Sequence, residues 1–230
     1  MSIQAVAFDV DQTLWDFHSH RRAALVACLE LLCNRATCEA PWAWSIDDLQ
    51  ARYDRIEASA PGERLATIRH ESLVEAAAEA APGDNSLGDE LTDLYFSIRH
   101  GPASPFDDAT QCLDRLAGMG VRLAVVTNGN SDLVGLGLAE YFEVIVVGPD
   151  IGMAKPEARI YAEVSKRLAV TPSELVCVGD DPVKDVAAPQ RLGWKGVWND
   201  RKVVTLPPDV RPDATIEHLA ELPPIVARWR

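Results

Sequence analysis

Basic residues are scarce in this sequence. It has 22 lysines and arginines against 35 aspartates and glutamates, which gives a formal net charge of −13. Because phosphate backbones and anionic headgroups attract basic surfaces, this charge argues against binding to nucleic acid polymers or to anionic membranes. A small anionic substrate is compatible with it only where the fold supplies a local positive site.

Long apolar runs and closely spaced cysteines are also lacking. No uninterrupted apolar segment could span a bilayer, and "MSIQAVAFDVD" at the N-terminus has no basic start, which argues against a signal peptide. The five cysteines show none of the close pairing of zinc or redox motifs. We expect buried free thiols in the reducing cytoplasm, at Cys28, Cys33, Cys38, Cys112 and Cys177.

What the sequence does have is alternation of strand-like and helix-like segments beyond residue 105. After the first apolar run, "IQAVAFDV", strands are expected at "VRLAVVTN", "FEVIVVG", "ELVCVGDD" and "KGVWN", with a last strand and helix in "DATIEHLAEL". Helices are expected between them, at 107–117, 132–138, 157–168 and 183–192. This order predicts an α/β fold with a doubly wound parallel sheet.

Residues 19–100 follow a different pattern, with no convincing strand. Helical stretches are expected at "HRRAALVACLELLCN", "SIDDLQARYDRIEA", "ERLATIRHESLVEAAAEAA" and "LGDELTDLYFSIR", separated by proline- and glycine-containing turns. We therefore predict a core domain of residues 1–17 and 101–230, interrupted by an inserted helical domain of residues 18–100.

Two aspartates, Asp9 and Asp11, follow the first strand two positions apart. In an extended strand they would share one side, about 6–7 Å apart by strand rise. Like charges that close repel unless a cation or a shared proton compensates them.

Further polar clusters follow other strands, at the edge where doubly wound sheets place their sites. These are Thr127-Asn128, Asp180-Asp181, and Lys155 in "GMAKPE". Carboxylates from two strands suit Mg²⁺, while a lysine and a hydroxyl can bind a phosphoryl group. One carboxylate can then act as nucleophile and the second as general acid and base.

Each cluster taken alone has an ordinary structural interpretation. Asp9 and Asp11 could be an N-cap and a turn acid, Lys155-Pro156 a plain loop before a helix, and the later acids a charged helix N-terminus. Their occurrence together, each after a strand-like run, favours a catalytic site.

The motifs, in their order, resemble those of the haloacid dehalogenase superfamily. "DVDQT" is similar to its first motif, "VVTNG" to the second, "AKPEARIY" to the lysine motif and "VGDDPVKDV" to the acidic fourth motif. The resemblance implies a Rossmann-like core, and it gives the helical insertion the place and type of the family's cap. Caps of this kind close over the site and select the leaving group.

The resemblance also implies roles for the two first aspartates and for the phosphoryl-binding residues. Asp9 would be the nucleophile that forms a phosphoaspartyl intermediate. Asp11 would protonate the leaving oxygen and then activate water. Thr127 and Lys155 would hold the phosphoryl group, with the backbone near Asn128 assisting.

By the same resemblance, Mg²⁺ would be bound by Asp9, the carbonyl of Asp11 and Asp180. Asp185 matches the trailing acid of the fourth motif and is expected to pair with Lys155 or with a metal-bound water. Asp181 stands where serine is frequent, which leaves its role open.

Two features concern neighbours of the first motif. Gln12 replaces the commonest glycine at its position without changing any reacting group. Side chains just after the motif either contact substrate or form a helix start with solvated arginines; they are Trp15, Phe17, His18, Arg21 and Arg22.

These expectations favour a cytoplasmic Mg²⁺-dependent phosphatase whose partner is a small phosphorylated metabolite. A phosphomutase would use the same residues and differ only in the phosphoryl acceptor. A 2-haloacid dehalogenase needs the nucleophile but no leaving-group acid, so Asp11 argues against it. A phospho-accepting signalling domain is the least favoured alternative, because such domains lack a cap. Monomer and homodimer are equally compatible with the sequence.

Overall fold

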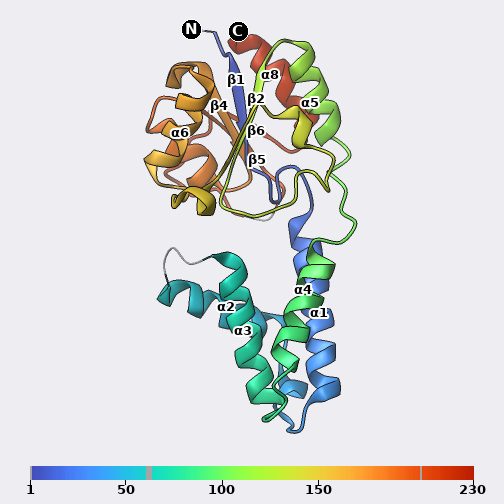
Figure 1. The fold of residues 1–230 in the computed structure, drawn as a ribbon. Helices are drawn as coiled ribbons and strands as arrows, with labels where there is room; N and C mark the ends of the chain where they lie inside the picture. Colours follow the sequence, from blue (N-terminus) through green and yellow to red (C-terminus); the bar gives the residue numbers. More distant parts are fainter. Residues whose placement is uncertain (1, 61–63, 203) are drawn as a thin grey trace. The chain divides into compact units, whose positions relative to one another are not determined.

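The computed structural model describes residues 2–60, 64–202 and 204–230 (Figure 1). It divides into two compact units, which we call the core unit (Met1–Asp16 with Ala103–Arg230) and the helical unit (Phe17–Pro102). The chain thus leaves the core unit shortly after the first motif and returns to it before the second. The role of the helical unit as a cap remains a prediction.

One sheet of six parallel strands organises the core unit, in the order β3-β2-β1-β4-β5-β6 (Figure 1). The strands are β1 (Ala5–Phe8), β2 (Arg122–Thr127), β3 (Val144–Val147), β4 (Leu175–Gly179), β5 (Lys195–Asn199) and β6 (Ala214–Ile216). This order is that of a Rossmann-like doubly wound sheet. The predicted fold class is confirmed.

Helices cover both faces of this sheet. They are α5 (Ala109–Gly118), α6 (Ala158–Leu168), α7 (Ala188–Gln190) and α8 (Leu222–Trp229), with a wider π-helical segment η5 (Pro182–Ala187) and short 3-10 turns η2 (Ala139–Tyr141), η3 (Gly148–Ile151), η4 (Pro172–Glu174) and η6 (Leu219–Glu221). Ala5 and Ala7 of β1 pack toward α6, with Tyr161. Because strand side chains alternate, the buried Val6 and Phe8 point to the other face. Figure 1 shows α5 and α8 on the side of the sheet opposite to α6. Burial on both faces explains why β1 is wholly apolar.

In the described part of the helical unit, four helices pack around their own apolar core. They are α1 (Phe17–Arg35), α2 (Ile46–Ser59), α3 (Leu65–Ala80) and α4 (Leu87–Arg99), with the short turn η1 (Ala40–Ala43) after α1. Ser45 and Asp48 form a capping box at the start of α2. The core includes Leu32, Leu73 and Leu91. The third predicted helical stretch begins at Glu63, which lies outside the described residues.

Two local predictions were wrong. Residues 132–138 form turns rather than a helix, since Asp132 caps the backbone N–H of Val134 and Gly137 adopts a left-handed φ of 68°. Cys38 is exposed, because it lies in the turn after α1 and not on a helix face, and Cys33 is only half-buried. The other three thiols are buried, as expected.

Within the described residues, no helix combines the length and the apolar character that crossing a membrane requires.

Candidate active site

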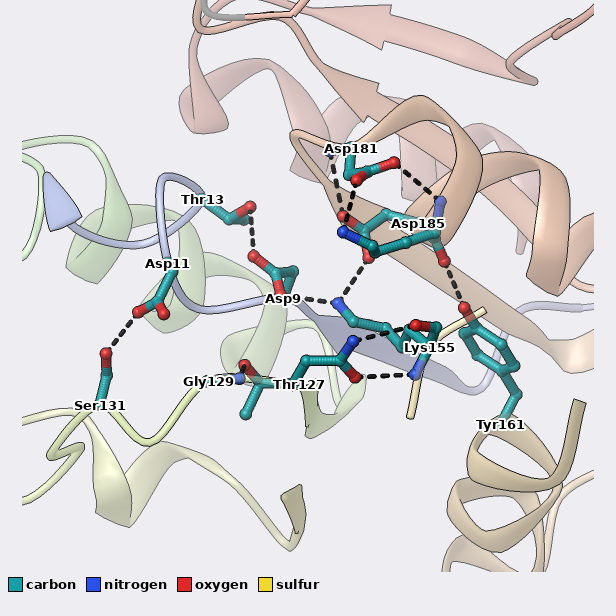
Figure 2. A network of polar contacts seen from close by, with 12 residues as sticks. Asp9, Asp11, Thr13, Thr127, Gly129, Ser131, Lys155, Tyr161, Asp181 and Asp185 are labelled. Atoms are coloured by element: carbon teal, nitrogen blue, oxygen red, sulfur yellow. Dashed lines mark hydrogen bonds and ion pairs between the residues drawn. The ribbon is translucent and has the colours of Figure 1, made fainter. Parts of the chain in front are cut away.

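Asp9 extends β1 by one residue at the carboxyl edge of the sheet. Its backbone N–H donates to the carbonyl of Val178 in β4, at 2.9 Å. The residue is only 7% exposed. Oδ1 accepts a hydrogen bond from Lys155 Nζ at 2.6 Å, and Oδ2 accepts one from the Thr13 hydroxyl at 3.2 Å (Figure 2). The carboxylate is thus fixed between a charged donor and a neutral one.

Lys155 reaches this carboxylate from the loop before α6. Its side chain is buried, and Nζ also donates to Asp185 Oδ1 at 2.7 Å. Burial alone lowers the pKa of a lysine, but the charges of Asp185 and Asp9 outweigh it and hold the pKa of Lys155 well above its usual value. The lysine therefore remains a cation beside Asp9.

Two residues at the end of β2 face the same region. Thr127 is buried, and its hydroxyl accepts a hydrogen bond from the backbone N–H of Gly129 at 2.9 Å. The amide of Asn128 binds the backbone of Lys155 twice, donating to its carbonyl at 2.9 Å and accepting from its N–H at 2.7 Å. The side chain of Asn128 therefore positions Lys155, and a contribution of the nearby backbone to phosphate binding stays a prediction.

Three carboxylates gather at this edge of the sheet, two at the ends of β1 and β4 and one in η5. Asp9, Asp180 and Asp185 each offer an oxygen, and these oxygens lie within 4.8 Å of one another. Burial, together with the charges of Asp9 and Asp185, raises the pKa of Asp180 to about 8. Burial also raises the pKa of Asp185 to about 6, against the lowering effect of Lys155. One ammonium group does not neutralise three acids this close.

This donor set fits a hard divalent cation. Mg²⁺ prefers oxygen ligands and is usually held by a few carboxylates, with its remaining positions open to water and substrate. A dication here would offset both the burial of the Asp180 charge and its repulsion by Asp9 and Asp185, which together raise the pKa of Asp180. Asp185 lies closer to this group than the sequence indicated, since it contributes an oxygen to it as well as pairing with Lys155.

Asp181 has a different environment. Its Oδ1 accepts hydrogen bonds from the backbone N–H groups of Val183 and Lys184, at 2.9 and 3.0 Å, and its Oδ2 lies 3.0 Å from Lys184 Nζ. These contacts cap η5 and lower the pKa of Asp181 although its burial acts to raise it. The structure therefore gives this carboxylate a capping role, which a serine could also fill.

Asp11 lies outside the carboxylate group. Its Oδ1 accepts a hydrogen bond from the indole Nε1 of Trp15 at 2.9 Å. The same oxygen accepts another from the hydroxyl of Ser131 (Figure 2). β1 ends at Phe8, so the strand geometry assumed for the aspartate pair does not extend to Asp11. Gln12 next to it adopts a left-handed φ of 62°. That conformation explains why glycine would suit the position.

Sequence reasoning missed three residues of this site. Thr13 closes the first motif, "DVDQT", and binds Asp9, yet no role was expected for it. Ser131 follows the second motif and binds Asp11. Gly179 lies so close to Asp185 that a β-carbon on it would fall 2.1 Å from Oδ2. A glycine directly before paired aspartates is a signal that could have indicated this close approach.

The residues after the first motif lie in both units. Trp15 belongs to the core unit through its bond to Asp11. In the helical unit the Phe17 ring lies near His18, and the Arg21 Cζ is 5.7 Å from its centroid. Arg22 is exposed. Contacts of these residues with substrate stay predictions.

Comparison with known proteins gives close and extensive matches. A family model described as haloacid dehalogenase-like hydrolase matches residues 3–193. Phosphoserine phosphatase from Thermus thermophilus is 33% identical over 79% of this chain and 76% of its own length. Glyceraldehyde 3-phosphate phosphatase from Methanopyrus kandleri is 29% identical over 83% of this chain and 81% of its own.

A solved structure supports the same relationship. The crystal structure of 2-haloacid dehalogenase from Pseudomonas syringae pv. tomato superposes with a TM-score of 0.76 at 31% identity, covering 99% of this chain and all of that one. The family model covers most of the chain, and its span includes all four motifs and every residue of the site described above. The chain therefore belongs to the haloacid dehalogenase-like hydrolase family.

Proposed function

We propose that the protein is a Mg²⁺-dependent phosphatase that hydrolyses a small phosphorylated metabolite through a phosphoaspartyl intermediate on Asp9. The observation that carries this proposal is the buried Asp9 carboxylate, held by Lys155 and Thr13 beside Asp180 and Asp185. A fixed carboxylate next to a permanent cation is suited to attack an anionic phosphoryl group. The similarity to two phosphatases supports the choice of reaction.

The reaction divides between two aspartates. An oxygen of Asp9 attacks phosphorus, and the bond from phosphorus to the leaving oxygen breaks while Asp11 gives that oxygen its proton. Water then attacks the phosphorus of the aspartyl phosphate, and the Asp11 carboxylate takes a proton from this water. Phosphate leaves, and both aspartates return to their starting states.

Lys155 and Thr127 bind the oxygens of the transferring phosphoryl group. Lys155 is suited to this because two carboxylates keep it charged and the Asn128 amide fixes its backbone. Charge-assisted hydrogen bonds from a fixed donor are stronger than those of a mobile one, since no reorganisation is needed during the reaction.

Asp9, Asp180 and the backbone carbonyl of Asp11 would hold Mg²⁺, with Asp185 able to bind it or one of its waters. Bound there, the ion supplies positive charge that offsets the phosphoryl charge.

The test is Asp9→Asn, assayed by hydrolysis of p-nitrophenyl phosphate and by circular dichroism. Because an amide is a poor nucleophile, we expect a loss of roughly 10³-fold or more with the fold retained. The matched control is Asp150→Asn, an exposed acid of the same unit, which should keep wild-type activity. Substantial residual hydrolysis in the Asp9 variant would remove the nucleophile assignment.

A screen of phosphorylated metabolites, with Mg²⁺ and with a chelator, would identify the substrate class. Release of inorganic phosphate supports a phosphatase. Isomerisation of a sugar phosphate without phosphate release would instead identify a phosphomutase.

A second candidate function is 2-haloacid dehalogenation, favoured by the 31% identity to a dehalogenase over nearly the whole chain. The same carboxylate would displace halide from carbon. Asp11 argues against it, because halide leaves without a proton and the site needs no acid for it. Halide release from 2-chloropropionate, faster than hydrolysis of any phosphate ester in the screen, would reverse the preference.

A further inference from the structure

The carboxylate of Asp11 is held by donors from two separate segments. Trp15 lies in the loop that follows β1, and Ser131 lies in the loop that follows β2. Both donate to the same oxygen, Oδ1. Figure 2 shows the Asp11 side chain directed toward Ser131, on the opposite side from Lys155. Two donors converging on one oxygen restrict rotation of the carboxylate about its Cβ–Cγ bond.

The other oxygen lies against Gly129. A β-carbon on Gly129 would fall 2.3 Å from Asp11 Oδ2 and 3.3 Å from the Thr127 hydroxyl oxygen. Oδ2 therefore occupies space that any other residue at position 129 would need. The position of this β-carbon is close to both Asp11 Oδ2 and the Thr127 hydroxyl. Oδ2 is therefore the Asp11 oxygen that faces the hydroxyl proposed to bind the phosphoryl group.

We propose that Ser131 is a positioning residue for proton transfer by Asp11. This inference rests on the proposed phosphatase function. By binding Oδ1, together with Trp15, the Ser131 hydroxyl turns the carboxylate so that Oδ2 lies beside Gly129 and Thr127. Residues 127–131, at the end of β2 and just after it, then have two functions. Thr127 supplies the hydroxyl that binds the phosphoryl group, and Ser131 orients Asp11, the acid that protonates the leaving oxygen.

Ser131 itself gains and loses no proton in this scheme. Asp11 gives its proton to the leaving oxygen as the bond to phosphorus breaks, and it recovers one from the attacking water. Misorientation of Asp11 should therefore slow the reaction most where the leaving group needs the proton, and least where the leaving group departs without it.

The test compares Ser131→Ala with wild type on p-nitrophenyl phosphate, whose leaving group departs readily, and on phenyl phosphate, whose leaving group needs a proton. The measured quantity is the ratio of the two kcat/KM values, which reports steps up to departure of the leaving group. We expect this ratio to rise about tenfold in the alanine variant, a part of the roughly 10²–10⁴-fold that a general acid contributes. Ser131→Thr keeps the hydroxyl and should return the ratio to near the wild-type value.

The matched control is Asn130→Ala, because Asn130 is the exposed neighbour in the same loop. It should leave the ratio unchanged. If Ser131→Ala proves unfolded by circular dichroism, Ser131→Cys takes its place, since cysteine has nearly the same shape and is a weaker donor.

An equal loss on both substrates would mean that Ser131 only supports the loop, and it would overturn the inference. So would an unchanged ratio in Asp11→Asn, because there would be no proton transfer to position. Neither result affects the assignment of Asp9 as the nucleophile. Inactivity of Asp9→Asn would still support the proposed phosphatase.

Discussion

Lys155 of the core unit and Arg69 of the helical unit, which also buries Arg99, are buried cations with different surroundings. In the core unit, Lys155 lies between Asp9 and Asp185 at hydrogen-bond distance. In the helical unit, Arg69 lies against aromatic rings, with its Cζ 4.2 Å from the Tyr53 centroid and 4.8 Å from that of Tyr95. The two pKa values accordingly shift in opposite directions, upward for Lys155 and downward for Arg69, where burial dominates.

The polar partners of Arg69, unlike those of Lys155, are neutral side chains. One of its nitrogens, Nη2, donates to Gln50 Oε1 at 2.8 Å, while Nε and Nη1 have no hydrogen-bond partner within the part of the chain that the structure describes. A flat guanidinium tolerates such a site because it stacks on rings and is weakly hydrated, whereas a compact ammonium does not. The contrast indicates that Lys155 contributes mainly through its charge and Arg69 mainly through packing.

Lys155→Met is the strongest test of this contrast. It removes the positive charge from a buried group of acids, and breaking such a pair typically costs about 3–5 kcal/mol of unfolding free energy. We expect that loss in urea titrations at pH 8 without metal, together with loss of phosphatase activity. Adding Asp185→Asn to this variant should restore part of the stability but none of the activity. Wild-type stability of the single variant would show that the acids do not depend on Lys155.

Asp180 provides a second test, through pH. The folded state raises its pKa from 3.8 to about 8, so the folded protein binds this proton more tightly than the unfolded chain. Without metal, the resulting stability is complete below pH 4 and is lost as pH rises toward 8. Mg²⁺ competes with the proton, and its stabilising effect should therefore grow over the same range.

The measurement is the rise in Tm on adding Mg²⁺ at pH 6 and at pH 8, with NaCl of equal ionic strength as the reference. A larger rise at pH 8 is expected. Asp180→Asn should abolish most of this pH dependence, because the amide does not ionise. The same rise at both pH values in the wild type would contradict a metal site that includes Asp180.

The sequence predicted the parallel sheet and the gathering of the motif residues at one of its edges, and both predictions rest on the same physical reason. Apolar runs such as "VAF" and "LVCVG" can be buried on both faces only in a covered parallel sheet, and parallel strands bring their carboxyl ends to one edge. Asp9 and Asp180 were therefore expected at the same edge of the sheet, and the pairing of β1 with β4 brings them close together. Lys155 was located less directly, through its place between two motifs.

Side-chain direction was the part that the sequence did not reveal. Asp11 turns toward Ser131 because the chain leaves the strand at Phe8 and passes through a left-handed Gln12, and neither feature has a periodic signal. The amide of Asn128 binds the backbone of Lys155 for the same kind of reason, since a loop places it beside that residue. Local hydrogen bonds of loops decide such details, and hydrophobic patterning does not encode them.

The smallest expected effect is that of Arg69→Met. This change keeps the aliphatic stem and removes a charge that has no carboxylate at hydrogen-bond distance within the described residues. The lost ring contacts are worth about 0.5–2 kcal/mol and the bond to Gln50 about 0.5–1.5 kcal/mol, while relief from burying the charge offsets them. We expect a net change within about 1 kcal/mol in urea unfolding, well below the effect of Lys155→Met.

The informative control is Arg69→Lys, which keeps the charge. An ammonium group among these rings would lose hydration without gaining a carboxylate, so this conservative change should destabilise the protein more than Arg69→Met does. At position 155 we expect the opposite order of stability, because the positive charge there pairs with Asp9 and Asp185. Lys155→Arg, which keeps the charge, should be more stable than Lys155→Met, which removes it. If Arg69→Lys were more stable than Arg69→Met, the charge of Arg69 would stabilise the protein as that of Lys155 does, and the contrast between the two residues would be wrong.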